Sequence, residues 1–110
     1  MSLAALDQAF AALADPTRRA IVERLARSPT RVTDVAEPFR MSLNAVSKHV
    51  KVLERAGLLR RLRRGREHVL VLEPAPLRHV ARWAERWERF WNERLDRLEE
   101  FLEAEKKERP

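Results

Sequence analysis

The chain lacks cysteine and tyrosine, and only two of its 110 residues are glycine. The absence of cysteine excludes disulfides, thiolate metal sites, iron–sulfur ligation and cysteine nucleophiles. No apolar run approaches the roughly 20 residues that a membrane-spanning helix needs. The N-terminal segment carries Asp7 and lacks the basic region of a signal peptide. We therefore expect a cytoplasmic protein with no membrane partner and one domain over residues 1–110.

What the chain does contain is helix-forming residues and positive charge. Ala, Leu, Glu and Arg dominate, which favours a mainly helical fold. Lys and Arg outnumber Asp and Glu by 23 to 17, and the net charge is +6. Residues 42–66 hold eight basic residues and one acidic residue, so this window alone carries +7. A localised basic patch is typical of a polyanion-binding protein, although a charge run alone also suits a solvated surface.

Apolar spacing and punctuation residues predict the secondary structure. We expect helices at 2–13, 16–27, 33–39 and 43–56, strands at 58–62 and 67–72, and a last helix at 76–105. Pro38 should keep the third helix short or bent. Gly65 suits a hairpin turn because it adopts positive φ without strain. The predicted N-cap residues are Asp15, Thr33 and Ser42. Gly57 is predicted to end the fourth helix, and Pro76 is predicted to be the first residue of the last helix.

The third and fourth helices form a helix-turn-helix pattern. Val46, Val50 and Leu53 give the fourth helix one apolar face. The opposite face carries side chains that contact base edges and phosphates in DNA-reading helices, namely Asn44, Ser47, Lys48 and Lys51. We therefore predict that residues 42–56 form a reading helix. His49 either touches DNA or packs inward.

The two predicted strands form a hairpin whose turn is strongly basic. Residues 58–72 are predicted to form a wing beside the reading helix. Its tip arginines would clamp phosphates or enter the minor groove. The alternative is that they only keep an edge hairpin soluble. The basic residues flanking the turn are Arg60, Arg61, Arg63, Arg64 and Arg66.

The last helix carries an apolar stripe rich in tryptophan. So small a body cannot bury all of these rings, and exposed rings would form a large apolar patch. We predict a two-fold dimer through the first and last helices, with residues 76–105 as the dimerisation helix. The alternative is that the rings also line a small-molecule pocket. The predicted interface residues are Leu3, Leu6, Phe10, Trp83, Trp87, Phe90, Trp91, Leu95 and Leu98.

Three stretches resemble the ArsR/SmtB family of winged-helix repressors. They are FAALADPTRRAIVERL at 10–25, MSLNAVSKHVKVLERAGLL at 41–59 and RGRE at 64–67. The resemblance covers about residues 6–73 and looks most like the branch with an aromatic-rich last helix. It implies a homodimeric winged helix, mainly α with a small β-hairpin in the order α-α-α-α-β-β-α. It also implies operator binding that represses transcription until an effector relieves it.

The resemblance also implies which residues contact DNA and which metal sites are incomplete. The matching DNA-contact positions are Ser42, Asn44, Ser47 and Lys48 in the reading helix and Arg63, Arg64 and Arg66 in the wing. Metal sensors of the family place cysteines at the start of the third helix, where this chain has Arg31 and Thr33. A second family site on the last helix would retain His79 and Glu93, but Leu77 and Phe90 fill its other positions. Two ligands of four do not close a metal site, so we expect no metal and no cofactor.

The predicted function is therefore a homodimeric, sequence-specific DNA-binding regulator that represses transcription at a near-palindromic operator. Its partners would be double-stranded DNA, a second copy of itself and a small-molecule inducer of unknown identity. An enzyme is not expected, because the three histidines, at 49, 68 and 79, lie in no catalytic or metal-ligand spacing. The alternatives are a winged-helix activator, or a protein-interaction module whose aromatic last helix binds another protein.

Overall fold

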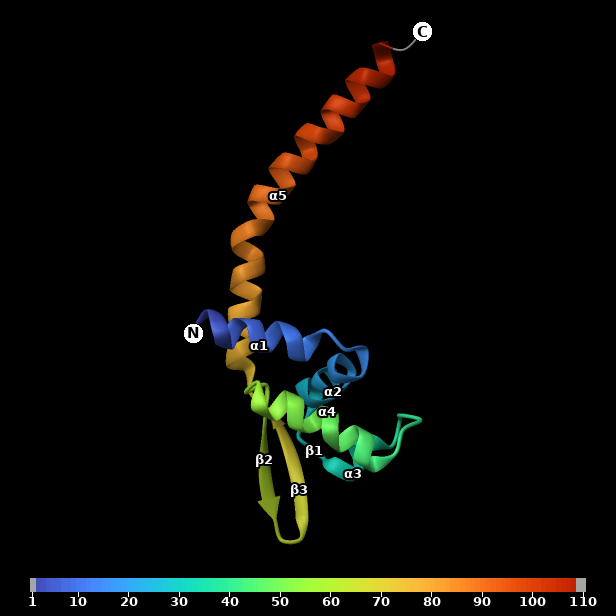
Figure 1. The fold of residues 1–110 in the computed structure, drawn as a ribbon, viewed down its shortest axis with the longest axis vertical. Helices are drawn as coiled ribbons and strands as arrows, with labels where there is room; N and C mark the ends of the chain where they lie inside the picture. Colours follow the sequence, from blue (N-terminus) through green and yellow to red (C-terminus); the bar gives the residue numbers. More distant parts are fainter. Residues whose placement is uncertain (1, 109–110) are drawn as a thin grey trace. The chain divides into compact units, whose positions relative to one another are not determined.

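Figure 1 shows the helices that precede the wing, and capping side chains set where three of them begin. The computed structural model describes residues 2–108. Helix α1 (Leu3–Leu13) follows Ser2, α2 (Pro16–Arg27) follows Asp15, and α4 (Leu43–Arg55) follows Ser42. Asp15 Oδ2 accepts a hydrogen bond from the Arg18 amide, and Ser42 Oγ accepts one from the Ala45 amide, both at 3.1 Å. The predicted caps Asp15 and Ser42 are thus confirmed.

The third helix is shorter than predicted and begins elsewhere. Helix α3 spans Val32–Ala36, and its N-cap is Arg31, which makes no side-chain capping bond. The predicted cap at Thr33 is wrong, because an extended strand holds the backbone up to Arg31 and the helix starts directly after it. The expectation that Pro38 keeps this helix short is confirmed, since the helix ends before Pro38.

The strand before α3 is β1 (Thr30–Arg31). The sequence did not predict this strand, so the predicted order of elements is wrong at this point. Strand β1 pairs antiparallel with β3 (Glu67–Leu72), placing Thr30 opposite Leu70 and Arg31 opposite Val69. Strand β2 (Leu59–Arg64) pairs with the other edge of β3, so the sheet order is β1-β3-β2. The sheet therefore has three antiparallel strands, and two of them form the predicted wing.

The wing closes through a two-residue loop. The last pair of the ladder is Arg64 opposite Glu67, which leaves Gly65 and Arg66 to make the turn. Gly65 has φ +63°, and no non-glycine residue in the described chain has positive φ. This is the pattern of a type II′ turn, whose twist suits a hairpin. Strand β2 covers 59–64 instead of the predicted 58–62, because Arg63 and Arg64 stay in register with β3.

A Schellman motif ends α4 and starts the wing. Gly57, at φ +74°, donates its amide to the Glu54 carbonyl, and the Leu58 amide reaches the Leu53 carbonyl, both at 3.0 Å. The predicted role of Gly57 is confirmed. Leu58 is fully buried, and its carbonyl accepts the Glu73 amide at 2.9 Å. The wing base is therefore fixed directly to the end of the reading helix.

One hydrophobic core lies among α2, α3, α4 and the sheet. The predicted apolar face of α4 is buried completely, with Val46, Val50 and Leu53 at zero exposure. Burying each such side chain contributes about 1.5–3 kcal/mol. Packing of this face fixes the rotation of α4 about its axis and leaves its opposite face in solvent. The buried apolar residues around it include Ile21, Leu25, Val35, Leu58, Leu59 and Leu70.

The last helix is longer than predicted at both ends. Helix α5 spans Pro74–Glu108, so Pro74 and not Pro76 is its first residue. Both prolines are compatible with a first turn, because the first four amides of a helix have no helical acceptor. The chain divides into two compact units, residues 1–80 and residues 81–110, and α5 begins in the first. The single domain over 1–110 stays a prediction.

Candidate nucleic-acid interface

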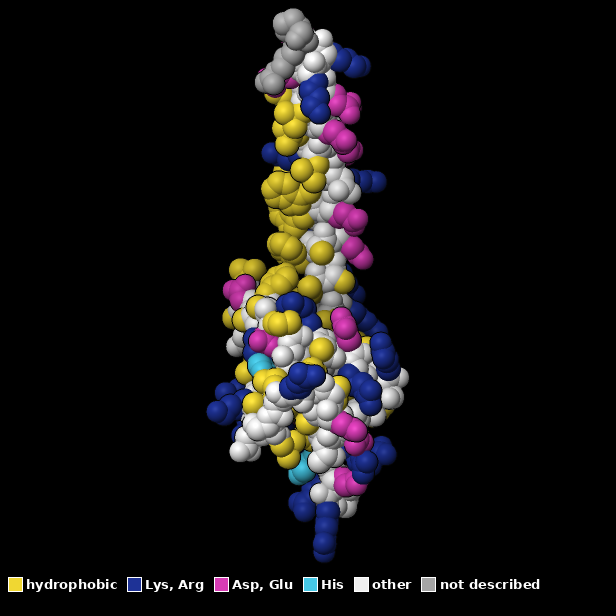
Figure 2. Space-filling model, turned by 90° about the vertical axis from the view of Figure 1, so that its right-hand side faces the viewer, with side chains coloured by type: hydrophobic (Ala, Val, Ile, Leu, Met, Phe, Trp, Pro, Cys, Tyr) yellow, Lys and Arg dark blue, Asp and Glu magenta, His cyan; other side chains and the backbone are white. Residues whose placement is uncertain are grey.

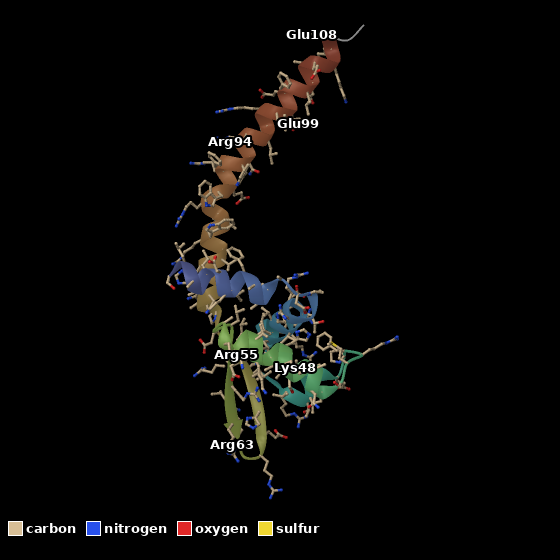
Figure 3. All side chains as sticks on the ribbon, in the orientation of Figure 1. Lys48, Arg55, Arg63, Arg94, Glu99 and Glu108 are labelled. Atoms are coloured by element: carbon tan, nitrogen blue, oxygen red, sulfur yellow. The ribbon has the colours of Figure 1, made fainter. Side chains whose placement is uncertain are left out.

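The solvent-facing side of α4 carries the predicted reading residues. Asn44, Lys48 and Lys51 are exposed, and Ser47 is half-buried at the border of the packed face. Figure 3 shows Lys48 on this helix. Ser42 is exposed at the helix start, where its hydroxyl oxygen caps the first turn. The first amides of α4 have no helical acceptor and can donate to a phosphate.

Ion pairing divides the five arginines that flank the wing turn into two groups. Arg60 Nε lies 2.6 Å from Glu73 Oε1, and Arg61 Nε lies 3.5 Å from Glu54 Oε2. These two arginines are partly neutralised at the base of the wing. Glu73 and Glu54 reach them because the hairpin and the end of α4 are packed together. The remaining three arginines are at the tip and have no acidic partner among the described residues.

The unpaired cations are those predicted to contact DNA. Lys48, Lys51, Arg64 and Arg66 make no hydrogen bond or ion pair within residues 2–108. Arg63 Nε donates only to the Gly65 carbonyl at 3.2 Å, which leaves its charge uncompensated. Figure 3 places Arg63 at the far end of the hairpin. These five predicted DNA-contacting cations are therefore available to a polyanion.

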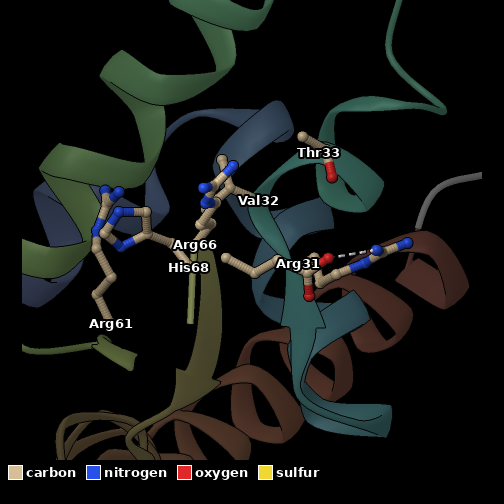
Figure 4. A pocket seen from close by; sticks show the side chains of 7 residues that line it. Arg31, Val32, Thr33, Arg61, Arg66 and His68 are labelled. Atoms are coloured by element: carbon tan, nitrogen blue, oxygen red, sulfur yellow. Dashed lines mark hydrogen bonds and ion pairs between the residues drawn. The ribbon is translucent and has the colours of Figure 1, made fainter. Parts of the chain in front are cut away.

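A pocket of about 300 Å³ lies beside the wing, where β1 and the start of α3 face β2 and β3 (Figure 4). Arg31 forms one wall through ion pairs of 2.9 Å to Asp34 and to Glu67. Hydrogen bonds to these two carboxylates raise the pKa of Arg31 above its ordinary value. Arg31 is therefore a structural tie between α3 and the wing. The lining residues are Arg31, Val32, Thr33, Arg61, Arg66, Glu67 and His68.

His49 packs inward, so of the two roles left open by the sequence the structure supports the packing role. Its side chain is one-fifth exposed, and Nδ1 lies 3.3 Å from Arg18 Nη1. Asp15 Oδ2 is 3.9 Å from the same nitrogen. The hydrogen bond from the Arg18 amide is the main cause that lowers the pKa of Asp15, with His49 adding a smaller electrostatic effect. Asp15, Arg18 and His49 form one polar cluster behind the reading helix.

In the second unit, an apolar stripe runs along α5 (Figure 2). Trp87 and Phe90 pack edge to face with ring centroids 5.5 Å apart, and Phe90 and Trp91 do so at 5.6 Å. Arg94 Cζ lies 4.2 Å from the centroid of the Phe90 ring, in cation–π geometry. Trp91, Leu95 and Leu98 are each more than half exposed. The exposed apolar residues of this unit are Trp83, Trp87, Phe90, Trp91, Leu95, Leu98, Phe101 and Leu102.

The residues of α1 that were predicted to join a dimer differ in exposure. Leu3 is 82% exposed and Phe10 is 37% exposed, whereas Leu6 is half-buried. Leu3 therefore offers an apolar side chain to solvent in the isolated protomer.

Comparison with known proteins places this arrangement in a family. Residues 13–61, which span α2 to the start of the wing, match a family model described as a helix-turn-helix domain. The HTH-type transcriptional regulator Rv2034 of Mycobacterium tuberculosis (strain ATCC 25618 / H37Rv) is 40% identical over 99 residues, covering 90% of each chain. A crystal structure of the ArsR family transcriptional regulator RHA00566 superposes with TM-score 0.74 at 39% identity, over 80% of this chain and 97% of that one. The chain belongs to the ArsR family of winged helix-turn-helix transcriptional regulators.

This ArsR-family regulator is also similar to the transcriptional repressor SdpR of Bacillus subtilis (strain 168). The two are 30% identical over 78 residues, covering 71% of this chain and 87% of SdpR. In the part of the chain that is described, α3 and α4 are the helix-turn-helix, and β2 and β3 are the wing. No helix among residues 2–108 is long and apolar enough to cross a membrane.

Of the positions compared with the family's metal sites, Arg31 and Thr33 stand in place of cysteines, whereas His79 and Glu93 are potential ligands. Arg31 is held by two carboxylates, and exposed Thr33 lies in the first turn of α3. On α5, His79 is half-buried and Glu93 is exposed. Within the described residues, no three His, Cys, Asp or Glu side chains gather as a metal site would need.

The sequence did not predict Arg40 as a candidate DNA-contacting residue. Arg40 lies in the turn between α3 and α4, two residues before the Ser42 cap, and is exposed. It makes no hydrogen bond or ion pair among residues 2–108. The available sequence signal was its position two residues before the predicted Ser42 cap, which puts a further positive charge near the start of α4.

Proposed function

We propose that this regulator is a homodimeric repressor that binds a near-palindromic operator. The observation that carries the proposal is the separation of paired from unpaired cations. Arg60 and Arg61 are partly neutralised at the base of the wing, whereas the cations of α4 and of the wing tip have no acidic partner among residues 2–108. Evenly solvated basic surfaces do not require this division. Unpaired cations suit a phosphate-binding surface, because they bind phosphate without first losing a carboxylate partner.

Each candidate residue has a role set by its position. Asn44, Ser47 and Lys48 follow the start of α4 and would contact base edges in the major groove. An asparagine amide can donate to adenine N7 and accept from adenine N6, and lysine can donate to guanine O6 or N7. Lys51, one turn later, would hold a phosphate. Arg63, Arg64 and Arg66 would hold phosphates or enter the minor groove beside the half-site. Ser42 would contribute its hydroxyl and the first amides of the helix.

The dimer is supported by the apolar stripe of α5. Its aromatic rings and leucines form an exposed apolar stripe that a second copy would bury, and Leu3 of α1 is exposed as well. A two-fold pair of reading helices about 34–36 Å apart addresses successive major grooves, so the operator would be near-palindromic.

The proposed repressor neither catalyses a reaction nor senses metal through the two family sites described above. Repression is supported by the similarity to SdpR, which is a transcriptional repressor. The inducer would be a small molecule or another ligand whose identity the site chemistry does not specify. The alternative of an activator differs only in where the operator lies relative to the promoter. A protein-interaction module would instead use the aromatic stripe of α5 on another protein.

The test is binding of the purified protein to the duplex upstream of its own gene, measured by fluorescence anisotropy against a scrambled duplex of equal length. Specific recognition predicts a preference of about a thousandfold or more. If all ten unpaired candidate cations, five from each protomer, neutralised a phosphate each, the slope of log affinity against log salt would reach an upper limit of about −9, at about −0.9 per phosphate. Absence of binding to either duplex at low salt would refute the DNA-binding function.

A matched pair of variants tests the division of the cations. K48Q/R64Q removes two unpaired charges from each protomer, and R60Q/R61Q removes two paired ones. We expect K48Q/R64Q to reduce the salt slope by up to about 3.6, which is four phosphates at about 0.9 each. R60Q/R61Q should change the slope far less, since its arginines already have carboxylate partners. Equal losses in both variants would contradict the assignment.

A further inference from the structure

Arg18 joins three helices of the first unit through one guanidinium group. Its Nε donates to the Ala12 carbonyl at 2.6 Å, and its Nη2 donates to the Ala11 carbonyl at 3.2 Å. Both carbonyls belong to the last turn of α1. Its Nη1 is 3.3 Å from His49 Nδ1, in the middle of α4. All three contacts begin from the first turn of α2, where the Arg18 amide also binds the Asp15 cap.

These contacts bridge two elements with different roles. Helix α1 carries residues of the proposed dimer interface, and α4 carries the proposed reading residues. The three helices contact one another in the first unit (Figure 1). Helix α1 contributes the buried Ala12 and the partly buried Leu13 to the hydrophobic core, which also holds the buried face of α4. The Arg18 bonds add a directional polar link between α1 and α4 to this apolar packing.

We propose that Arg18 is a positioning residue that holds the reading helix in register with the end of α1, and so sets the reach of the two reading helices in the dimer. The inference rests on the proposed operator binding. Arg18 touches no DNA in this scheme. It acts through His49, which lies next to Lys48 in sequence but faces inward, toward α2.

Only arginine can make this set of bonds. The guanidinium presents donors in a rigid planar fork, so that Nε and Nη2 reach two successive carbonyls while Nη1 reaches the imidazole. A lysine ammonium is a single point and cannot contact α1 and α4 in the same way. Arg18→Lys therefore preserves the charge and removes the bridge.

The neighbouring arginine supplies a matched control. Arg19 Nη1 donates to the Leu13 carbonyl at 2.8 Å, so it also ties α2 to the end of α1. Among the described residues it makes no hydrogen bond or ion pair to α4. Arg19→Lys therefore perturbs the same helix end with the same chemistry but leaves the α4 bridge intact.

The experiment compares wild type, Arg18→Lys and Arg19→Lys in binding to two duplexes, one selected by the wild-type protein from a random library and one scrambled. Circular dichroism and sedimentation first confirm that each protein is folded and dimeric at the assay temperature. We expect Arg18→Lys to lower the ratio of specific to scrambled affinity by about tenfold or more, which is the loss expected when one base contact per half-site is misplaced. Arg19→Lys should change the ratio less than about twofold.

A double-mutant cycle identifies the path through His49. His49→Leu removes the acceptor, and we expect it to lower the same ratio as Arg18→Lys does. The double variant should be no worse than either single variant, because both remove the same contact. His49→Gln retains an acceptor oxygen and should restore most of the ratio. Losses that multiply in the double variant would show independent roles and overturn the proposal.

Failure of the proposal is distinct from failure of the proposed function. If the wild type selects no duplex, operator binding itself is refuted. If the wild type is specific and Arg18→Lys has the same ratio of specific to scrambled affinity, the positioning role is overturned while operator binding stands. Equal weakening on both duplexes would also overturn it, because a purely structural loss lowers the active fraction without changing the ratio.

Discussion

At the scale of single residues, the contacts of each charged side chain separate framework from ligand-binding roles. Arg18, Arg31, Arg60 and Arg61 have partners within the first unit, and they hold helices or strands together. A sequence shows how many cations a window contains but not which are neutralised. Glu73 lies 13 positions from Arg60, and only the hairpin register brings them together.

The Asp15 cap predicts a pH dependence of stability. Its pKa is lowered in the folded state, chiefly by the hydrogen bond from the Arg18 amide. A lowered folded pKa means that the carboxylate stabilises the fold above its unfolded pKa, and that this contribution is lost as the pH falls through the folded pKa. Asp15→Asn still caps the helix but does not titrate. We expect its melting temperature to fall less than that of wild type between pH 6 and pH 3.

The control is Asp7→Asn, which removes an exposed carboxylate of α1 that has no hydrogen bond or ion pair among the described residues. Thermal melts followed by circular dichroism across this pH range measure the difference. A pH profile of Asp15→Asn that matches the profiles of wild type and Asp7→Asn would exclude a stabilising role for the carboxylate charge.

At the scale of secondary-structure elements, the sequence predicted those that have strong local signals. Ser42 and Gly57 bound α4 through a cap and a Schellman motif, and Gly65 marks the wing turn. The two-residue strand β1 has no periodicity to detect, and it exists only because β3 offers an edge. Its presence also moved the start of α3 away from Thr33. Long-range pairing thus overrode the local capping signal.

The wing turn allows a sharp test of backbone strain. Gly65 has φ +63°, and a Cβ atom there would meet nothing within 4 Å. Gly65→Ala should therefore destabilise the protein by the backbone cost alone, about 1 kcal/mol. This corresponds to a fall of roughly 4–8 °C in melting temperature for a domain of this size. Gly65→Asn should lose less, because hairpin turns of this kind accept asparagine at positive φ more readily than alanine. Equal losses for both variants would point to a cause other than φ.

At the scale of the whole molecule, the reading residues and the apolar stripe belong to different compact units. The sequence predicted both sets of residues from their spacing. It could not predict that Leu6 is half-buried, whereas Leu3 is almost fully exposed, because both occupy the same apolar pattern. Burial of Leu6 depends on the packing of its surroundings, which spacing alone does not encode.

Dimerisation through α5 predicts the effect of a charge in the stripe. Leu95 is 57% exposed in the protomer, so Leu95→Glu should leave the protomer folded. In a dimer, the same change would bury an unpaired carboxylate, which is costly. We expect dimerisation to weaken by about tenfold or more, measured by analytical ultracentrifugation. The control is Asn92→Glu. It adds the same charge three residues earlier on α5, at a position that is not one of the exposed apolar residues. An unchanged dimer in Leu95→Glu would exclude this face as the interface.

The concentration of aromatic residues in one segment also gives the protein a built-in optical probe. All three tryptophans lie within residues 83–91, and the chain has no tyrosine. Emission excited in the near ultraviolet therefore originates from the second unit, while α4 and the wing contribute no indole or phenol. Association of the α5 stripe should shift this emission to shorter wavelength as the rings leave water. Unlabelled protein can thus report its own assembly while DNA binding is followed separately on a labelled duplex.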